Sequence, residues 1–513
     1  MDKKKSLLNV SFSVAFRIAI LIVNILVRRY LINYIGNAVN GLNSLYASIL
    51  DFLAVAELGV GTAITFCMYK PIVDGDNDKV SAFYHLFTKL YLIIGGIILV
   101  AGCAVMPFLP LLAKGYADVE VNLYLTFGFV LVAVVTTYIF SSKTSLINAY
   151  KNNYVTTTVY SVSILLQCIV QIVVVIFTHS FVWFLVCRIF ASIAQWLATE
   201  FIARAKYGYI IKNKQKADAE TKKEVVKNVK AMFMHKIGNV LVNGADSLII
   251  SAFIGIVILG KYSNYYIVMA ALTSVLSLVF TSLTSIVGHM SVDEDKEEVK
   301  RYHNFFHTLN FILGLVFFLG YFAVIDNLVI IFFKGEDLIL SKSVSFIITL
   351  NGFIQYMRQA TLLFRDATGT FYNDRWKALF EGLLNIVLSI LFVIVFPEEY
   401  KIVGVIVATI LTNIFICHIV EPYVLFKYAF DSKTKRYYLK NYVYIAIFTV
   451  SLVGLNFAMV QYTGSHLVTL LLNGLISVGI SLIVGLLAIL TDRNFKNYFK
   501  KMFTRIKQKA SKK

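Results

Sequence analysis

The sequence predicts an all-α, polytopic membrane protein with about 14 transmembrane helices, arranged as two parallel six-helix lobes plus two C-terminal helices. Three observations lead to this fold class. The 513 residues are 58% hydrophobic and only 15% charged, whereas soluble proteins have about 25% charged residues. Long apolar stretches recur along the whole chain. The stretches of the first part are echoed in the second, which indicates a duplication.

Each predicted span is long enough to cross the hydrocarbon layer, which needs roughly 20 mainly apolar residues. The spans lie near 8–30, 42–67, 87–111, 121–141, 155–178, 181–203, 232–257, 262–288, 305–325, 344–364, 378–396, 402–426, 441–461 and 466–490. They define a six-helix lobe over 1–203, a basic cytoplasmic linker over 204–231, a second six-helix lobe over 232–427, and two further helices with a basic tail over 428–513.

Lysine and arginine orient the chain, because these residues are enriched in short cytoplasmic loops. With the N-terminus inside, only seven of the 48 fall in outside loops: Arg28, Arg29, Lys114, Lys261, Lys334, Lys342 and Lys401. Arg17, Arg188 and Lys236 are counted within spans, and the other 38 on the cytoplasmic side, including Lys89 and Arg358 in the cytoplasmic halves of their spans. Both termini are therefore predicted to be cytoplasmic. Topology and contact with anionic lipid explain the net charge of +19 without a nucleic-acid partner.

The first lobe is repeated in the second. At an offset of 219 residues, positions 18–80 align without gaps, and 16 of these 63 positions are identical. The identities include Asn24/Asn243, Gly36/Gly255, Gly41/Gly260, Ser44/Ser263, Tyr46/Tyr265, Thr62/Thr281, Asp74/Asp293 and Asp76/Asp295. Two bundles repeated in the same orientation commonly enclose a substrate site and rock about it. The duplication therefore predicts a transporter.

No motif for nucleotide hydrolysis or metal binding is present in the sequence. Gly255 to Lys261 resembles part of a phosphate-binding loop, but Tyr262 follows where Ser or Thr is needed. Its glycines recur at Gly36 and Gly41, so we interpret them as turn glycines. The five cysteines are scattered without metal-ligand spacing. We therefore expect no enzyme activity, no metal and no other cofactor.

Basic residues in or beside the spans are the predicted substrate-binding groups. Ionisable groups inside a membrane are costly and usually face a cavity or a partner. A cavity lined by cations suits an anionic substrate, and arginine in particular suits phosphate oxygens. The predicted substrate-binding cations are Arg17, Arg28, Arg188, Lys236, Arg358 and Arg365.

Further polar residues complete the predicted cavity or couple transport to an ion; they are Asn24, Asp51, Glu57, Asn239, Asn243 and Asp246. Arg17 and Glu57 lie at about the same depth, so an ion pair between them is one interpretation. The repeat places Lys236 at the position of Arg17, while Leu276 stands at the position of Glu57. Lys236 is therefore either an unpaired cation in a water-filled cavity or paired elsewhere, for instance with Asp246.

Short motifs are spread over nearly the whole chain: Tyr34-Ile35-Gly36, Ser48-Ile49-Leu50 through Ala56-Glu57-Leu58-Gly59, Tyr69-Lys70-Pro71, Phe364-Arg365-Asp366-Ala367-Thr368-Gly369 with Asp374-Arg375, and Glu381 with Asn385. Together they resemble the polysaccharide (oligosaccharidyl-lipid) flippase family, which is Wzx-like and belongs to the multidrug, oligosaccharidyl-lipid and polysaccharide exporter superfamily.

The resemblance implies a flippase in the bacterial cell membrane. It implies alternating access that moves an oligosaccharide repeat unit on undecaprenyl pyrophosphate from the cytoplasmic to the outer leaflet, for capsule, exopolysaccharide or O-antigen synthesis. The implied partners are this lipid-linked oligosaccharide, membrane lipids and polysaccharide polymerase or assembly proteins. Relatives use ion gradients, so coupling to H⁺ or Na⁺ is left open.

Other functions are not excluded by the sequence. The lipid II flippases share the architecture. A cation-coupled small-molecule or drug antiporter of the same superfamily would favour carboxylates in the cavity, such as Asp51 and Asp246. A membrane-embedded polysaccharide polymerase fits less well, because the outside loops are short and His179 is the one histidine placed in them. A scaffold protein would rarely bury arginines on matched faces.

Overall fold

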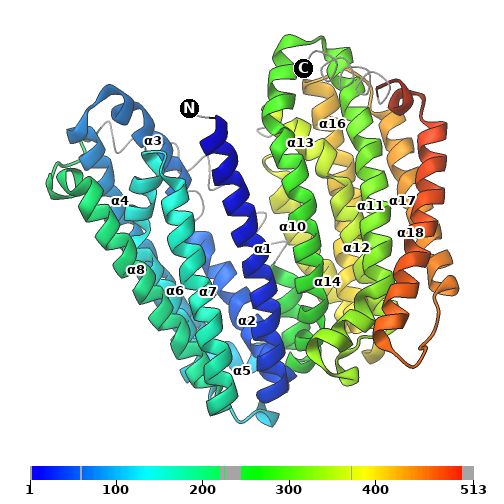
Figure 1. Cartoon of the computed structure of the whole chain (residues 1–513), viewed down its shortest axis with the longest axis horizontal. Coiled ribbons are helices and arrows are strands. Elements are labelled where there is room, and N and C mark those ends of the chain that lie inside the picture. Colours follow the sequence, from blue (N-terminus) through cyan, green and yellow to red (C-terminus); the bar gives the residue numbers. More distant parts are fainter. Residues whose placement is uncertain (1–2, 58–59, 220–224, 226–243, 371–372, 499–513) are drawn as a thin grey trace. The chain divides into compact units, whose positions relative to one another are not determined.

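The computed structural model describes residues 3–57, 60–219, 225, 244–370 and 373–498. Every regular element within these ranges is a helix, which confirms the all-α fold class. The chain forms two compact units, here called unit 1 (Met1–Lys261) and unit 2 (Tyr262–Lys513). The boundary between the units falls within one helix, α10 (Ile256–Asp293) (Figure 1).

Unit 1 is a bundle of long helices joined by short turns. Its helices are α1 (Lys3–Tyr34), α2 (Asn37–Leu53), α3 (Val60–Asp74), α4 (Asn77–Val105), α5 (Leu109–Leu112), α6 (Leu123–Ala149), α7 (Asn153–Thr178) and α8 (Phe181–Lys212). A short 3₁₀ helix, Ala54–Glu57, follows α2, and a π-helical turn, Ile250–Ile254, precedes α10 (Ile256–Asp293). α6 packs against α3, α4 and α8, while α7 packs against α1 and α8.

Unit 2 is built around one 38-residue helix, α11 (Lys296–Phe333). The others are α12 (Lys342–Met357), α13 (Gln359–Ala367), α14 (Lys377–Val395), α15 (Lys401–Thr412), a π-helical turn (Asn413–Cys417), α16 (His418–Tyr428), α17 (Lys435–Ala458) and α18 (His466–Thr491). α11 contacts α12, α13, α17 and α18. The last two helices are therefore part of the packed body of unit 2.

Ten helices in the described ranges are long and apolar enough to cross a membrane, and each overlaps one predicted span. Four predicted spans are interrupted, contrary to the expectation of single helices. The span 42–67 divides into α2, the 3₁₀ helix and α3, and the span 344–364 divides into α12 and α13. The span 87–111 ends in a 3₁₀ helix (Met106–Phe108) and α5, and the span 402–426 contains the π-helical turn between α15 and α16. The span 8–30 lies in α1. The span 232–257 falls mostly outside the described residues.

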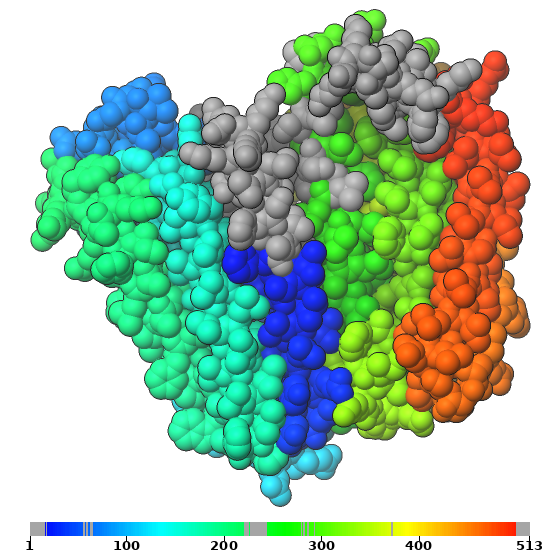
Figure 2. Space-filling model, viewed as in Figure 1, coloured from blue at the N-terminus to red at the C-terminus, as the bar shows by residue number. Residues whose placement is uncertain are grey.

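The helix α18 turns its polar side inward and its apolar side outward. Its buried residues are small or polar and are mostly four positions apart: Thr469, Asn473, Ser477, Ser481, Gly485 and Ala488. Its exposed residues include Leu467, Leu471, Leu475, Leu482, Leu486 and Leu490. This distribution suits a helix that faces lipid on one side and packs closely through small residues on the other. Figure 2 shows α18 (red-orange) lying along α11 (light green).

Close packing of α18 on α11 makes the interface sensitive to side-chain size. The Ser481 hydroxyl donates a hydrogen bond to the Leu315 carbonyl at 3.3 Å. We expect Ser481→Leu to destabilise the protein by about 1–3 kcal/mol, because overpacking forces the helices apart. Thermal unfolding in detergent measures this change. Ser481→Ala and Leu482→Ala, the latter at a lipid-facing position, should change it little, and a wild-type unfolding temperature for Ser481→Leu would contradict this packing.

The duplicated segments contribute a reciprocal contact within unit 1. A Cβ atom added at Gly41 would overlap the Ile256 carbonyl oxygen, and one added at Gly260 would overlap the Asn37 carbonyl oxygen. Both pairs of matched positions, 37 with 256 and 41 with 260, are separated by the repeat offset of 219 residues. Each copy thus uses the same two positions to contact the other, which supports the duplication inferred from the sequence.

Candidate functional site

Four charged side chains meet in the interior of unit 2, and we call them the ion cluster: Arg358, Lys377, Glu381 and Glu421. Arg358 donates from Nε and Nη2 to the two oxygens of Glu421, at 3.0 and 2.5 Å. Lys377 Nζ lies 2.6 Å from Glu421 and 3.0 Å from Glu381. The Glu421 side chain is 1% exposed and that of Glu381 4%. Two cations and two carboxylates therefore neutralise one another away from bulk water.

Two departures from α-helical geometry bring these side chains together. Arg358 lies at the break between α12 and α13. The π-helical turn of Asn413–Cys417 lies opposite, and Asn413 Oδ1 accepts a hydrogen bond from Arg358 Nη1 at 2.7 Å. Lys377 Nζ also lies 3.5 Å from Cys417 Sγ. π-helical turns are rare and often occur at functional sites. The ion cluster is therefore the candidate functional centre of unit 2.

A row of buried polar groups leads from the ion cluster toward α17 and α11. His418, just after the π-helical turn, lies with Nε2 2.9 Å from the Ile354 carbonyl oxygen and with Nδ1 2.9 Å from Asn441 Nδ2. Asn441 Oδ1 lies 3.1 Å from His307 Nε2. An amide that both donates and accepts can bridge two imidazoles. These contacts fit neutral histidines that each carry the proton on Nε2.

Arg365, another predicted cation, pairs with acidic residues near it in the sequence. It lies 2.9 Å from Asp374 and 3.0 Å from Asp366. The Asp374 side chain is almost fully buried. Arg358 and Arg365 are thus both held by carboxylates in this structure. Their predicted contact with substrate stays a prediction, and their local partners were not foreseen.

Unit 1 places Arg188 in a different environment. Its Nη1 donates to Asn43 Oδ1 at 3.4 Å, and no carboxylate in the described part of the chain forms an ion pair with it. Asn24 lies on α1, with Oδ1 3.8 Å from Cys168 Sγ of α7. The α7 helix packs against both α1 and α8. Unit 1 therefore gathers predicted polar residues of α1 and α8 around α7, and Arg28, also on α1, is half-buried.

The structure describes the positions of three further predicted residues, all of them acidic. Glu57 lies at the interruption after α2, where its Oε2 accepts a hydrogen bond from the Tyr138 hydroxyl at 2.8 Å. Asp51 is exposed, and Asp246 is buried in the helix Gly244–Ile254. The residues Lys236, Asn239 and Asn243, and the side chain of Arg17, lie outside the described part of the structure. The predicted ion pairs of Arg17 and Lys236 therefore stay predictions.

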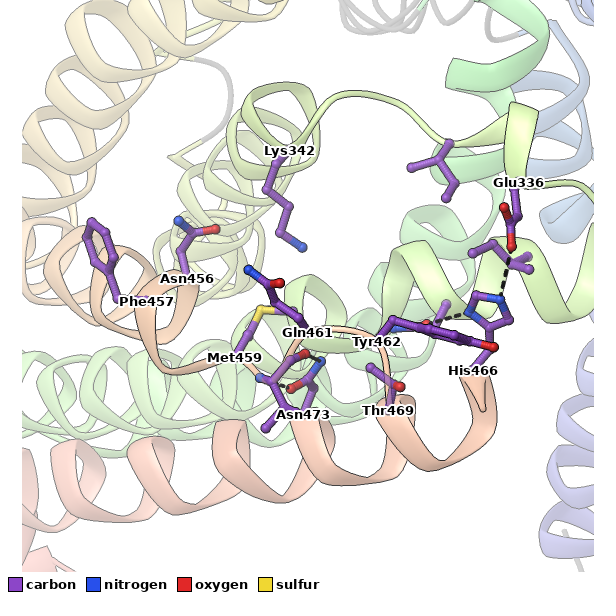
Figure 3. Close-up of a pocket in the computed structure, with 14 residues that line it drawn as sticks. Glu336, Lys342, Asn456, Phe457, Met459, Gln461, Tyr462, His466, Thr469 and Asn473 are labelled. Carbon is purple, nitrogen blue, oxygen red and sulfur yellow. Dashed lines mark hydrogen bonds and ion pairs between the residues drawn. The ribbon is translucent and has the colours of Figure 1, made fainter. Parts of the chain in front are cut away.

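A cavity of about 860 Å³ lies where α11 and α17 end and α12 and α18 begin. Figure 3 shows the polar ends of Lys342 and Gln461 facing each other across it. His466 lies 3.4 Å from Glu336 and 3.1 Å from Asn327. No predicted site residue lines this cavity. Its many amide groups suit a neutral, hydrogen-bonding ligand better than an anion.

The arrangement of helices is that of multi-pass membrane transporters and flippases. The lipid II flippase MurJ in an inward closed conformation matches with a TM-score of 0.65 and 15% identity, over 96% of this chain and 99% of that chain. An inward-facing multidrug resistance MATE family transporter of the MOP superfamily matches with a TM-score of 0.59 and 14% identity, over 77% and 92% of the two chains. No family model and no curated protein matches the sequence. At these identities the comparisons show the fold alone.

Proposed function

We propose that the protein is a flippase that moves undecaprenyl-pyrophosphate-linked oligosaccharide repeat units from the cytoplasmic to the outer leaflet by alternating access. The match to a lipid II flippase over 96% of this chain is the observation that carries the proposal. The match to the MATE transporter covers 77%. The fuller match supports a lipid-linked substrate over a small drug, and lipid II itself is the alternative lipid-linked substrate.

A pyrophosphate inside a membrane protein needs positive partners, because leaving its charge unpaired at low dielectric is costly. Charge-assisted hydrogen bonds from arginine supply such partners. Arg358 and Arg365 already bind carboxylates. Arg188 has an amide partner instead. Of Arg188, Arg358 and Arg365, Arg188 is therefore the one that we assign to the pyrophosphate.

The same proposal covers location, energy and partners. It places the protein in the bacterial cell membrane with both termini cytoplasmic, and it assigns alternating access to the lobes 1–203 and 232–427. Coupling to an H⁺ or Na⁺ gradient supplies the energy. Polysaccharide polymerase or assembly proteins receive the product on the outer side, and the protein itself has no catalytic role.

Arg188→Gln is expected to reduce transport about tenfold or more in proteoliposomes that contain the lipid-linked oligosaccharide. A hydrogen bond to a charged group contributes about 1.5–3 kcal/mol, and glutamine loses the charge. Arg188→Lys should retain part of the activity. Arg204→Gln is the matched control, because Arg204 lies on the same helix but is largely exposed.

Two results would count against the proposal. Full transport by a correctly folded Arg188→Gln protein would remove Arg188 from the substrate site. Transport of a small cationic drug, without movement of either the lipid-linked oligosaccharide or lipid II, would instead favour the antiporter.

A further inference from the structure

A cavity of about 630 Å³ lies where α11 and α17 begin and α18 ends. Its volume is within the range of about 300–1,000 Å³ that is typical of ligand sites. Six cationic side chains but only two carboxylates line it: Lys300, Arg301, Lys433, Arg436, Lys440 and Arg493, with Glu297 and Asp492. We call this cavity the basic pocket. It lies at the end of unit 2 that the sequence predicts to be cytoplasmic.

Both carboxylates of the basic pocket are already paired. Lys440 Nζ lies 2.7 Å from Asp492 and 2.7 Å from the Thr308 hydroxyl. Burial alone would raise the pKa of Asp492, but the Lys440 ammonium and the hydrogen bonds from Thr308 and the Phe495 N–H bring it below its usual value. Lys300 lies 3.2 Å from Glu297. The acidic groups of the pocket therefore pair with only two of its cations.

Of the other four cations, Arg301 lies 3.5 Å from Glu298, a carboxylate outside the lining of the pocket. The remaining three are available to a ligand. Lys433, Arg436 and Arg493 are exposed, and none of them forms an ion pair with a residue that the structure describes. They come from the loop before α17, the first turn of α17 and the segment after α18. Three cations from two parts of the chain that are distant in sequence surround one cavity, and they fit a phosphate group because arginine and lysine bind phosphate oxygens through charge-assisted hydrogen bonds.

The surface beside the pocket favours a lipid as the source of this phosphate. Leu482, Leu486 and Leu490 on α18 are exposed and face lipid. Arg493 follows Leu490 by three residues and lies just beyond the end of α18. A phospholipid whose chains lie along these leucines would place its headgroup at the level of the pocket. Tyr437 and Tyr444 also line the pocket and offer an apolar wall to the glycerol region.

Membrane topology alone explains why basic residues occur at this end of the protein. It does not explain why six of them line one cavity. The positive-inside rule concerns the number of Lys and Arg in short loops and does not require that they share a cavity. Basic pockets between membrane helices on the cytoplasmic side are known as sites for anionic lipid headgroups. We propose that the basic pocket binds the phosphate headgroup of an anionic phospholipid from the cytoplasmic leaflet.

The test compares lipid binding by two variants of the full-length protein that lose the same charge. The pocket variant carries Lys433→Gln, Arg436→Gln and Arg493→Gln. The control carries Lys212→Gln, Lys214→Gln and Lys216→Gln, which are exposed on the same predicted side but lie in unit 1. All six positions are exposed, so both variants should fold. Native mass spectrometry measures bound phosphatidylglycerol in protein released from phosphatidylcholine nanodiscs with increasing phosphatidylglycerol content.

We expect the pocket variant to bind phosphatidylglycerol at least about tenfold more weakly than wild type, since each basic residue near the surface contributes about 1 kcal/mol. The control should bind as wild type does. An equal loss in both variants would show diffuse attraction, and wild-type binding by the pocket variant would exclude the site. Binding of inorganic phosphate to the wild-type pocket without binding of phosphatidylglycerol would identify a soluble anion as the ligand and overturn the proposal.

Discussion

Glu421→Ala is expected to destabilise the protein by about 3–5 kcal/mol, because removal of one partner leaves buried charge uncompensated. In the ion cluster, Glu421 contacts both Arg358 and Lys377, and its side chain is 1% exposed. Without it, Glu381 alone faces the two cations, at 3.7 Å from Arg358 and 3.0 Å from Lys377. The expected result is a large decrease in the thermal unfolding temperature of the purified protein.

The double variant Arg358→Met with Glu421→Met separates charge imbalance from loss of contacts. It removes one cation and one carboxylate and keeps the pair between Lys377 and Glu381. Replacing a buried ion pair by apolar residues is often neutral, so this double variant should be more stable than Glu421→Ala. Glu399→Ala, at an exposed position of the same unit, controls for loss of a glutamate. If the double variant is as unstable as Glu421→Ala, charge balance is not the reason for the effect.

Transport by the same double variant also tests the predicted role of Arg358. A folded double variant that moves substrate at the wild-type rate would assign Arg358 to the ion cluster alone. Loss of transport with retained stability would support its contact with substrate. Measuring stability and transport together therefore distinguishes a role of Arg358 in the ion cluster from a role in substrate contact.

Hydropathy locates the membrane helices but not their interruptions. Ten of the predicted spans overlap apolar helices, because a stretch of about 20 apolar residues is a strong signal. The breaks near Ala54–Glu57 and at Arg358 give no such signal, since no proline marks either one. Side chains and neighbouring helices satisfy the backbone groups that such breaks release, and these partners are distant in the sequence.

In the candidate site, too, the sequence shows the charged residues but not which of them pair. Arg358 is conspicuous in the sequence as an ionisable residue inside a predicted span, and Glu381 and Glu421 are equally visible by that rule. The predicted anion site comprises cations and does not include Glu421. The pairing itself joins residues 63 positions apart, and single-sequence patterns carry no information about which distant residues meet. Lys377 lies one residue outside its predicted span and turns inward in the first turn of α14.

Gly41→Ala and Gly260→Ala are each expected to destabilise the protein by at least about 1–3 kcal/mol, because the new methyl group meets backbone that cannot rotate away. The obstacle is the Ile256 carbonyl at Gly41 and the Asn37 carbonyl at Gly260. Hydrogen bonds hold the two segments together, since Asn37 Nδ2 donates to the Val257 carbonyl at 2.9 Å. Thermal unfolding of each variant measures the loss.

Gly96→Ala is the matched control, because no atom lies within 4 Å of a Cβ added there, in the middle of α4. Alanine is the better helix former, so this variant should be as stable as wild type or more so. The reciprocal contact also makes a prediction about the two glycines together. One displacement of the paired segments relieves both clashes, so Gly41→Ala with Gly260→Ala should cost less than the sum of the single changes. Strict additivity would mean that the matched glycines of the two repeats do not share one contact.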